Sequence, residues 1–279
     1  MLNHDQRTQF ERDGYLVIPG FKSLDAIAAL RQRAGEIVNE FDPGASRTIF
    51  TTQNQVTATD DYFLRSDNTI RCFFEEEAFD ADGNLKQDKS LSINKIGHAL
   101  HDLDPVFEQF SRDPKLAAVA RDLGLKDARV WQSMYIFKQP GIGGEVRWHQ
   151  DATFFETTPV SVTTFWFALE DATIDNGCLW VEPGGHRGPM RERFVRDGDE
   201  ITMEKLDSTP WPDDSVAVPL EAKAGSLVCF HGLLPHYSAP NRSPVSRHAY
   251  TLHATDGTTS YSPRNWIQRD ASFPVRGFI

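Results

Sequence analysis

The 279-residue chain is poor in cysteine. Its three cysteines, Cys72, Cys178 and Cys229, are odd in number and far apart, and no CxxC pair occurs. A disulfide framework is therefore not expected, and a zinc site built from cysteines is excluded. This usage fits a reducing compartment, and we predict a cytoplasmic protein.

The chain also lacks long apolar runs and basic stripes. No apolar stretch reaches the roughly 18 residues of a membrane span, and the N-terminus has neither the basic start nor the apolar core of a secretory signal. The net charge of −11 would repel bare nucleic acid over most of the surface. We therefore expect a small-molecule substrate, and neither a nucleic acid nor a membrane as partner. The oligomeric state stays open.

The first 125 residues read as helical and mixed. Helices are expected over 3–13, 23–41, 93–103, 104–112 and 114–123, and strands over 15–18, 47–51 and 69–75. Asn3 and Ser23 are suited to cap the first two helices, and Gly14 is a stop signal.

The remaining residues, 126–279, are rich in short β-type runs separated by turn residues. The runs are ARVWQSMYIFKQ, VTTFWFALED, CLWVEPGG, SLVCFHG, HYSAP and RHAYTLHAT. This spacing indicates an antiparallel sandwich or barrel. Residues 187–215 are expected to form a long inserted loop, which is either a binding loop or tolerated decoration. No linker interrupts the chain, so residues 1–279 are predicted to form one mainly β domain.

The stretch RWHQDATFF places His149 and Asp151 two residues apart. On an extended strand, residues i and i+2 point to the same face, so both side chains can reach one metal ion. The pattern alone is weak, because such pairs also occur by chance at strand ends and in Asp-capped turns. A metal site therefore requires a third ligand from elsewhere in the chain.

His236 is the best candidate for that ligand, because it follows the turn GLLP at the start of a strand, where the loops of a barrel converge. His231 is interpreted as a hydrogen-bonded turn histidine. His186 is interpreted as a loop anchor, with substrate contact as the lesser alternative. His248 and His253 have opposite parity on one strand, so they cannot both point inward.

Two histidines and one carboxylate leave three open positions on Fe(II). The chelating co-substrate 2-oxoglutarate fills two of them and O₂ the third. The distal carboxylate of 2-oxoglutarate needs a rigid, permanently charged, bidentate partner, which arginine supplies better than lysine. Arg247 follows His236 across the loop NRSP, and a hairpin would return it beside the His236 strand. Taken alone, Arg247 is more simply interpreted as a surface arginine. The combination of His149, Asp151, His236 and Arg247 at this spacing is much more specific than any one of these residues.

At these residues the chain resembles the phytanoyl-CoA dioxygenase family of Fe(II)/2-oxoglutarate oxygenases, and within it the type called phytanoyl-CoA dioxygenase domain-containing protein 1. The similarity extends beyond the ligands to most of the chain. The matching segments are DGYLV, SINKIGHALH, QSMYIFKQP, DNGCLW followed by PGGH, and SPRNW.

The resemblance implies a double-stranded β-helix, that is, a cupin-like jelly-roll barrel with flanking N-terminal helices. It assigns iron ligation to His149, Asp151 and His236, and the 2-oxoglutarate clamp to Arg247. It suggests co-substrate contacts from Lys95, Met134 and Trp166, with Gln150 as a neighbour. Lys95 could instead be a solvated helix residue, and the other two could be core. By strand parity Gln150 points away from the metal, so its role would be indirect.

The predicted reaction is hydroxylation of an unactivated C–H bond, with release of succinate and CO₂. Apolar walls for the site are expected from Trp148, Phe154, Phe155, Phe165 and Phe167, some of which must be core. Trp148 stands where relatives often carry a small residue, and we expect it to shape the pocket. No clear Lys and Arg cluster marks a site for the phosphates of coenzyme A. The alternatives are a non-redox cupin-like metalloenzyme and a barrel-type binding protein without catalysis.

Overall fold

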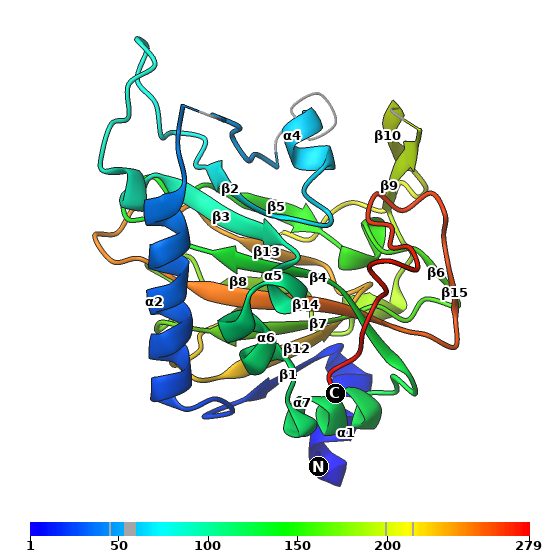
Figure 1. The fold of residues 1–279 in the computed structure, drawn as a ribbon. Helices are drawn as coiled ribbons and strands as arrows, with labels where there is room; N and C mark the ends of the chain where they lie inside the picture. Colours follow the sequence, from blue (N-terminus) through cyan, green and yellow to red (C-terminus); the bar gives the residue numbers. More distant parts are fainter. Residues whose placement is uncertain (45, 53–59, 199, 214) are drawn as a thin grey trace.

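The computed structural model describes residues 1–44, 46–52, 60–198, 200–213 and 215–279. Most of the strands belong to two antiparallel sheets (Figure 1). The larger sheet has the order β1 (Tyr15–Ile18), β12 (Leu227–His231), β7 (Thr163–Ala168), β14 (Ala249–Asp256), β4 (Ala128–Ile136), β3 (Ile93–His98) and β2 (Ile70–Phe74). The smaller sheet has the order β11 (Val218–Leu220), β8 (Leu179–Val181), β13 (His236–Ser238) and β5 (Val146–His149).

The helices come mostly from the first half of the chain. They are α1 (His4–Asp13), α2 (Leu24–Glu40), α4 (Asp61–Leu64), α5 (Leu100–Leu103), α6 (Pro105–Ser111) and α7 (Pro114–Asp122). Short 3₁₀ turns are η1 (Lys89–Leu91), η2 (Asp151–Thr153) and η3 (Gly185–Arg187). Two small strand pairs join β9 (Glu192–Asp197) with β10 (Glu200–Lys205), and β6 (Thr157–Thr158) with β15 (Ser260–Tyr261). None of the described helices combines the length and apolar character needed to cross a bilayer.

Side chains alternate between the two faces of the larger sheet. One face packs against the helices, and the other faces the smaller sheet. One face carries Tyr135, Phe167 and Tyr250 toward the helices. Phe107 of α6 meets Tyr135 and Tyr250 at ring distances of 6.2 and 5.2 Å, and Phe110 meets Phe167 at 5.1 Å. Figure 1 shows α2, α5 and α6 lying over the sheet.

The prediction of a mainly β, jelly-roll-type fold with flanking helices is confirmed by the two antiparallel sheets and by the solved structures described below. Among the described residues, the sheets face each other without joining into one closed ladder. The strands β1, β2 and β3 precede residue 125 yet belong to the larger sheet. That all 279 residues form a single domain stays a prediction.

The predicted start of the chain is confirmed in detail. The Asn3 side chain accepts a hydrogen bond from the Gln6 amide at 2.8 Å, as a helix cap does. Gly14 ends α1 with φ of 80°, and a Cβ there would lie 2.4 Å from Nδ1 of His186. Glycine is therefore required both by the backbone conformation and by the close approach of the imidazole.

The helix predicted over 93–103 is wrong for its first half. Ile93–His98 form β3, which pairs with β2 on one side and β4 on the other, and all six residues are buried. A strand buried on both faces shows no polar alternation, so its apolar run cannot be told from a helix by periodicity. Only Leu100–Leu103 are helical.

Two further expectations need correction. Residues 47–51 do not form a strand, since only a single bridge joins Ile49 to Phe74. The segment 187–215 is not simply a loop, because β9 and β10 pair over six positions within it. In EITMEK apolar and polar residues alternate at the start, whereas ERFVRD has no alternation, and Arg, Asp and Pro residues flank both strands, so the pair gives only a weak strand signal.

We predict that Phe107→Ala lowers the free energy of unfolding by about 3–5 kcal/mol, because it removes a fully buried ring between two tyrosines. Urea denaturation measures the change. Leu24→Ala is the control, since Leu24 is 68% exposed and its loss should matter by less than about 0.5 kcal/mol. A loss below about 1 kcal/mol for Phe107→Ala would contradict this packing.

Candidate metal and co-substrate site

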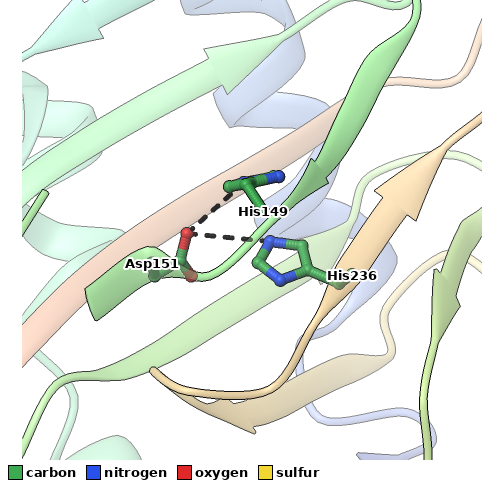
Figure 2. A group of neighbouring side chains, drawn as sticks. All are labelled: His149, Asp151 and His236. Carbon is green, nitrogen blue, oxygen red and sulfur yellow. Dashed lines mark ion pairs between the residues drawn. The ribbon is translucent and has the colours of Figure 1, made fainter. Parts of the chain in front are cut away.

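The smaller sheet places two histidines opposite each other. His149 is the last residue of β5 and His236 the first of β13, and the two are paired in register. Directly opposed residues of an antiparallel pair project to the same side. The two rings are accordingly 4.0 Å apart between centroids (Figure 2). His236 is buried, whereas His149 is partly exposed.

Asp151 lies just beyond β5, as the first residue of η2. The expectation that His149 and Asp151 share the face of one extended strand is therefore wrong in its geometry. The chain turns after Gln150 and brings the carboxylate back toward both imidazoles (Figure 2). Oδ1 of Asp151 is 3.6 Å from Nε2 of His149 and 3.6 Å from Nε2 of His236.

These three side chains fit a divalent metal ion. Atoms that each bind one ion at about 2.1 Å lie roughly 3 to 4 Å apart, and the ligand atoms of His149, Asp151 and His236 all lie within 4.8 Å of one another. Nδ1 of His149 is 2.8 Å from the Arg147 carbonyl, and Nδ1 of His236 is 3.0 Å from the Leu234 carbonyl. Each Nδ1–H can donate to its carbonyl, which leaves the Nε2 lone pair for the metal.

The second carboxylate oxygen is held from the larger sheet. Thr164 of β7 donates its hydroxyl to Oδ2 of Asp151, and Nε2 of His253 of β14 is 3.5 Å from the same oxygen. Oδ2 is thus engaged by the protein while Oδ1 faces the two imidazoles. Asp151 therefore links the two sheets.

Metal binding needs neutral imidazoles and an ionised carboxylate, and the pKa values of His149 and Asp151 are shifted in these directions. Burial lowers the pKa of His149 to about 3, and the neighbouring His236 adds to the effect. Burial alone would raise the pKa of Asp151. The imidazoles of His236 and His253 outweigh that effect and hold the pKa of Asp151 below its ordinary value.

A cavity of about 1000 Å³ opens between the sheets, and all three side chains line it. Its floor is the inner face of the larger sheet, where residues pair in rows across strands. His253 lies opposite Gln132 of β4 and Thr164 of β7. In the next row, Thr251 lies opposite Met134 and Trp166. Met134 and Trp166, both predicted co-substrate contacts, therefore share one row of the floor.

Arg247 lies beyond that row, two residues before the start of β14, and is fully buried. Its Nε donates to the Gly177 carbonyl at 3.1 Å and its Nη2 to Oγ of Ser238 at 3.2 Å, and its guanidinium carbon is 5.4 Å from the Trp166 ring centre. Its Nη1 is buried and has no partner among the described residues. A buried guanidinium with a spare N–H donor is suited to bind an anion.

The predicted hairpin between His236 and Arg247 does not form. β13 belongs to the smaller sheet and β14 to the larger one, so the chain crosses between sheets after Ser238. Arg247 nevertheless contacts the β13 strand, through Oγ of Ser238. The expected proximity thus arises across the cavity and not along one sheet.

Lys95 lies on β3 and not on a helix, and it lines the cavity. Its Nζ is 3.1 Å from the centre of the Phe50 ring and 3.7 Å from the sulfur of Met134. Burial lowers its pKa to about 7, only partly countered by Glu75. No carboxylate of the described chain lies within ion-pair distance of it, so an anionic ligand next to Met134 would complete its environment.

Gln150, between the two ligands, is fully buried and does not line the cavity. Its Nε2 donates to the carbonyls of Pro189 and Leu233 at 3.0 and 2.8 Å, and its Oε1 accepts from the Arg191 amide at 2.9 Å. The side chain thus joins both ligand-bearing segments to the start of the 187–215 insertion. This agrees with an indirect role.

Other candidates are distributed as follows. Nδ1 of His231 accepts from the Leu233 amide at 3.1 Å, as a turn histidine does, and His186 packs 5.4 Å from it. His248 faces the helix side, where Nδ1 is 2.8 Å from the Tyr135 hydroxyl. Of the proposed walls, Trp148, Phe154 and Phe155 line the cavity, whereas Phe165 and Phe167 belong to the helix-side core.

The sequence-based reasoning missed Thr164, Ser238 and the contact of His253 with Asp151. Thr164 has the same parity as the predicted Trp166, and His253 the same parity as the predicted Arg247, so alternation could have found both. Ser238 lies two residues after His236 on the same strand. The alternation of side chains does not predict how the two sheets pack. The contacts of Thr164, Ser238 and His253 with the other sheet depend on that packing.

We predict that Thr164→Val weakens metal binding by about 10- to 100-fold, because the carboxylate loses the hydroxyl that orients it. Competition between the protein and a chelator for Co(II) measures this. Thr163→Val is the matched control, since Thr163 is the buried neighbour on β7 and does not line the cavity. Equal affinities for the two variants would contradict the role of the Thr164 hydroxyl.

Comparisons with known proteins agree with this geometry. The sequence profile of the phytanoyl-CoA dioxygenase (PhyH) family matches residues 10–249. The phytanoyl-CoA dioxygenase of Arabidopsis thaliana is 49% identical over 96% of this chain and 94% of its own length. Phytanoyl-CoA dioxygenase domain-containing protein 1 of Rattus norvegicus is 45% identical over 98% of this chain and 97% of its own length.

Among solved structures, the epimerase SnoN in complex with Fe3+, alpha ketoglutarate and nogalamycin RO superimposes with a TM-score of 0.64. It is 17% identical, and the match covers 97% of each chain. At this identity the likeness establishes the fold. The predicted family resemblance, including the predicted subgroup, is confirmed by the relatives.

Proposed function

The chain belongs to the phytanoyl-CoA dioxygenase family, and from that premise we propose that it is an Fe(II)- and 2-oxoglutarate-dependent dioxygenase that hydroxylates a C–H bond of a small molecule. In the balanced reaction, substrate, 2-oxoglutarate and O₂ give the hydroxylated substrate, succinate and CO₂. The ligand type suits this chemistry, because two histidines and one carboxylate are the ligand set of non-haem Fe(II) oxygenases.

One observation supports the proposal most strongly. Two imidazole nitrogens and one carboxylate oxygen converge at one place of the cavity, and a buried Arg247 with a spare donor lies at the other end of the same floor. A chelating dicarboxylate needs both features at once, a metal for one end and a fixed cation for the other.

When bound, the iron supplies the oxidative chemistry, and the protein supplies position and environment. His149, Asp151 and His236 would hold the metal on one side and leave the cavity side open. Arg247 would bind the distal carboxylate of 2-oxoglutarate, and Lys95 would contact the co-substrate beside Met134.

The rings around the cavity would limit access of water. Trp148 stacks on Tyr237 with ring centroids 5.5 Å apart, and Phe154 and Phe155 also line the cavity. An apolar wall strengthens electrostatic interactions inside the site and protects reactive species from water.

The alternatives fit less well. A non-redox cupin-like enzyme would use a third histidine on the metal, but Nε2 of His253 faces Oδ2 of Asp151, away from the oxygen that the ligand imidazoles face. Such an enzyme also has no use for Arg247. A halogenase would replace the carboxylate ligand, and Asp151 is present. A binding protein without catalysis would not need the three ligands to stay intact.

We also propose where the protein acts and which substrate class it does not favour. The three cysteines are free and buried, which supports the cytoplasmic location proposed from the sequence. Apart from Asp151 and the basic residues Lys95, Lys138 and Arg247, the charged residues that line the cavity are Glu145, Arg147 and Glu192, and none of these three belongs to the larger sheet that forms its floor. This mixture does not favour the phosphates of coenzyme A.

Anaerobic addition of Fe(II) and 2-oxoglutarate tests the function. We expect a visible charge-transfer band, followed by succinate when O₂ is admitted. His149→Ala and Asp151→Ala should lose both signals, because each removes a ligand from a three-ligand set. Absence of the band and of succinate in the unaltered protein would end the oxygenase proposal.

Arg247→Ala should raise the KM for 2-oxoglutarate by roughly 10- to 150-fold, the equivalent of a lost hydrogen bond to a charged group. Succinate formation at varied 2-oxoglutarate measures it. Arg242→Ala is the matched control, because Arg242 lies exposed on the same connection and pairs with Glu77. If the KM of Arg247→Ala equals that of the control, the clamp assignment is wrong.

A further inference from the structure

The cavity floor has a charged end and an uncharged end. Along β4 the inward residues are Gln132, Met134 and Ile136, and Lys138 follows two residues after the strand ends. Along β14 His253 and Thr251 run in the opposite direction, and Arg247 lies two residues before the strand begins. The Arg247 amide meets the Lys138 carbonyl at 3.3 Å. The basic residues Arg247 and Lys138 therefore lie at one end, and Gln132 and His253 lie together at the other.

From this asymmetry we propose that the end of the cavity beyond Asp151 binds the prime substrate, that this substrate is uncharged and largely apolar, and that Gln132 recognises its hydrogen-bonding group. The inference rests on the proposed function, because it assigns the charged end to 2-oxoglutarate. It adds the chemical class of the other reactant.

The walls of this end are aromatic. His98 of β3 contacts Phe63 and Trp266 edge-on, at ring distances of 5.3 and 5.1 Å. Phe155 stacks on His253 at 5.1 Å with an interplanar angle of 15°. All five side chains line the cavity. Rings of this kind favour a flat or apolar molecule.

Two polar side chains on the floor of this end, His98 and Gln132, carry no charge. Nδ1 of His98 is 2.7 Å from Oγ of Ser66, and burial holds the pKa of His98 well below its ordinary value, so the imidazole is neutral. Gln132 carries an amide, which can both donate and accept. The charged group next to them is Asp151. Its Oδ2 contacts Thr164 and His253, and its Oδ1 faces the two ligand histidines.

The free energy of removing a ligand from water favours an uncharged substrate at this end. A charged group placed here would lose its water without gaining a counter-ion, which is costly. An amide, alcohol or ketone would instead exchange water for Gln132 at little cost. On the floor, Nζ of Lys95 lies 3.7 Å from the sulfur of Met134, in the co-substrate row.

Gln132 is also well placed to orient the substrate. It lies directly opposite His253 in the β4–β14 register, and His253 contacts Asp151. A substrate group bound to Gln132 would be anchored one side chain away from the metal ligands. Hydrogen bonding at that point therefore determines which C–H bond faces the site.

Three probes with one skeleton test the charge preference, namely 4-phenylbutanamide, 4-phenylbutanoate and 4-phenylbutylamine. Saturation-transfer NMR would measure their binding to protein loaded with Zn(II) and saturating 2-oxoglutarate, which occupies the charged end. We expect the amide to bind at least tenfold more tightly than either charged probe. Equal or tighter binding of the anion or the amine, or no binding by any of the three, overturns the proposal.

Variants at Gln132 test the recognition. Gln132→Leu should weaken the amide probe by roughly five- to tenfold, the equivalent of one neutral hydrogen bond, and leave 2-oxoglutarate binding unchanged. Gln132→Glu should make the amine the tightest probe. Gln32→Leu on the exposed face of α2 is the control. If both Gln132 variants keep the probe preferences of the unaltered protein, Gln132 does not recognise the substrate.

The charge-transfer band distinguishes a failure of the substrate inference from a failure of the proposed function. If the substrate inference is wrong, the anaerobic charge-transfer band with Fe(II) and 2-oxoglutarate remains, and only the probe preferences change. If the proposed function is wrong, the band is absent whichever probe is added.

Discussion

The carboxylate of Asp151 is the contact on which the site depends, because it joins the two sheets. Oδ1 faces His149 and His236 of the smaller sheet, and Oδ2 is held by Thr164 and His253 of the larger one. A shift of one sheet against the other would separate the ligands. The aromatic core between the larger sheet and its helices fixes that sheet from behind, so packing far from the cavity contributes to the geometry of the metal site.

The same two-sheet frame orders the cavity. The alternation of β4 and β14 sends every second residue inward, and their antiparallel pairing sets those residues in rows. The row of Gln132, His253 and Thr164 lies next to Asp151. The row of Met134 and Trp166 comes next, and Arg247 follows. A dicarboxylate and an uncharged substrate can therefore occupy one cavity without competing for the same groups. Separate ends of this kind give specificity to both reactants, since the uncharged end disfavours a carboxylate and the cationic end offers a neutral substrate no matching charge.

Much of this could be predicted from the sequence, and the misses have physical causes. His149, Asp151, His236 and Arg247 are recognisable because metal and dicarboxylate chemistry restrict the residue types. The geometry was less accessible: Asp151 begins a 3₁₀ turn, and Arg247 approaches His236's strand from the opposite sheet. Ile93–His98 read as helix because a doubly buried strand loses its alternation. Sequence periodicity reports the faces of one element, whereas Thr164 and His253 gain their roles from contacts between elements.

The most direct measurement is a crystal structure with Mn(II) and 2-oxoglutarate, since Mn(II) replaces Fe(II) without turnover. The account predicts the ion bound by Nε2 of His149, Nε2 of His236 and Oδ1 of Asp151. It also predicts the distal carboxylate of 2-oxoglutarate on the guanidinium of Arg247, with the space beside Gln132 left for substrate. An ion held by other residues, or a 2-oxoglutarate carboxylate bound away from Arg247, would contradict it.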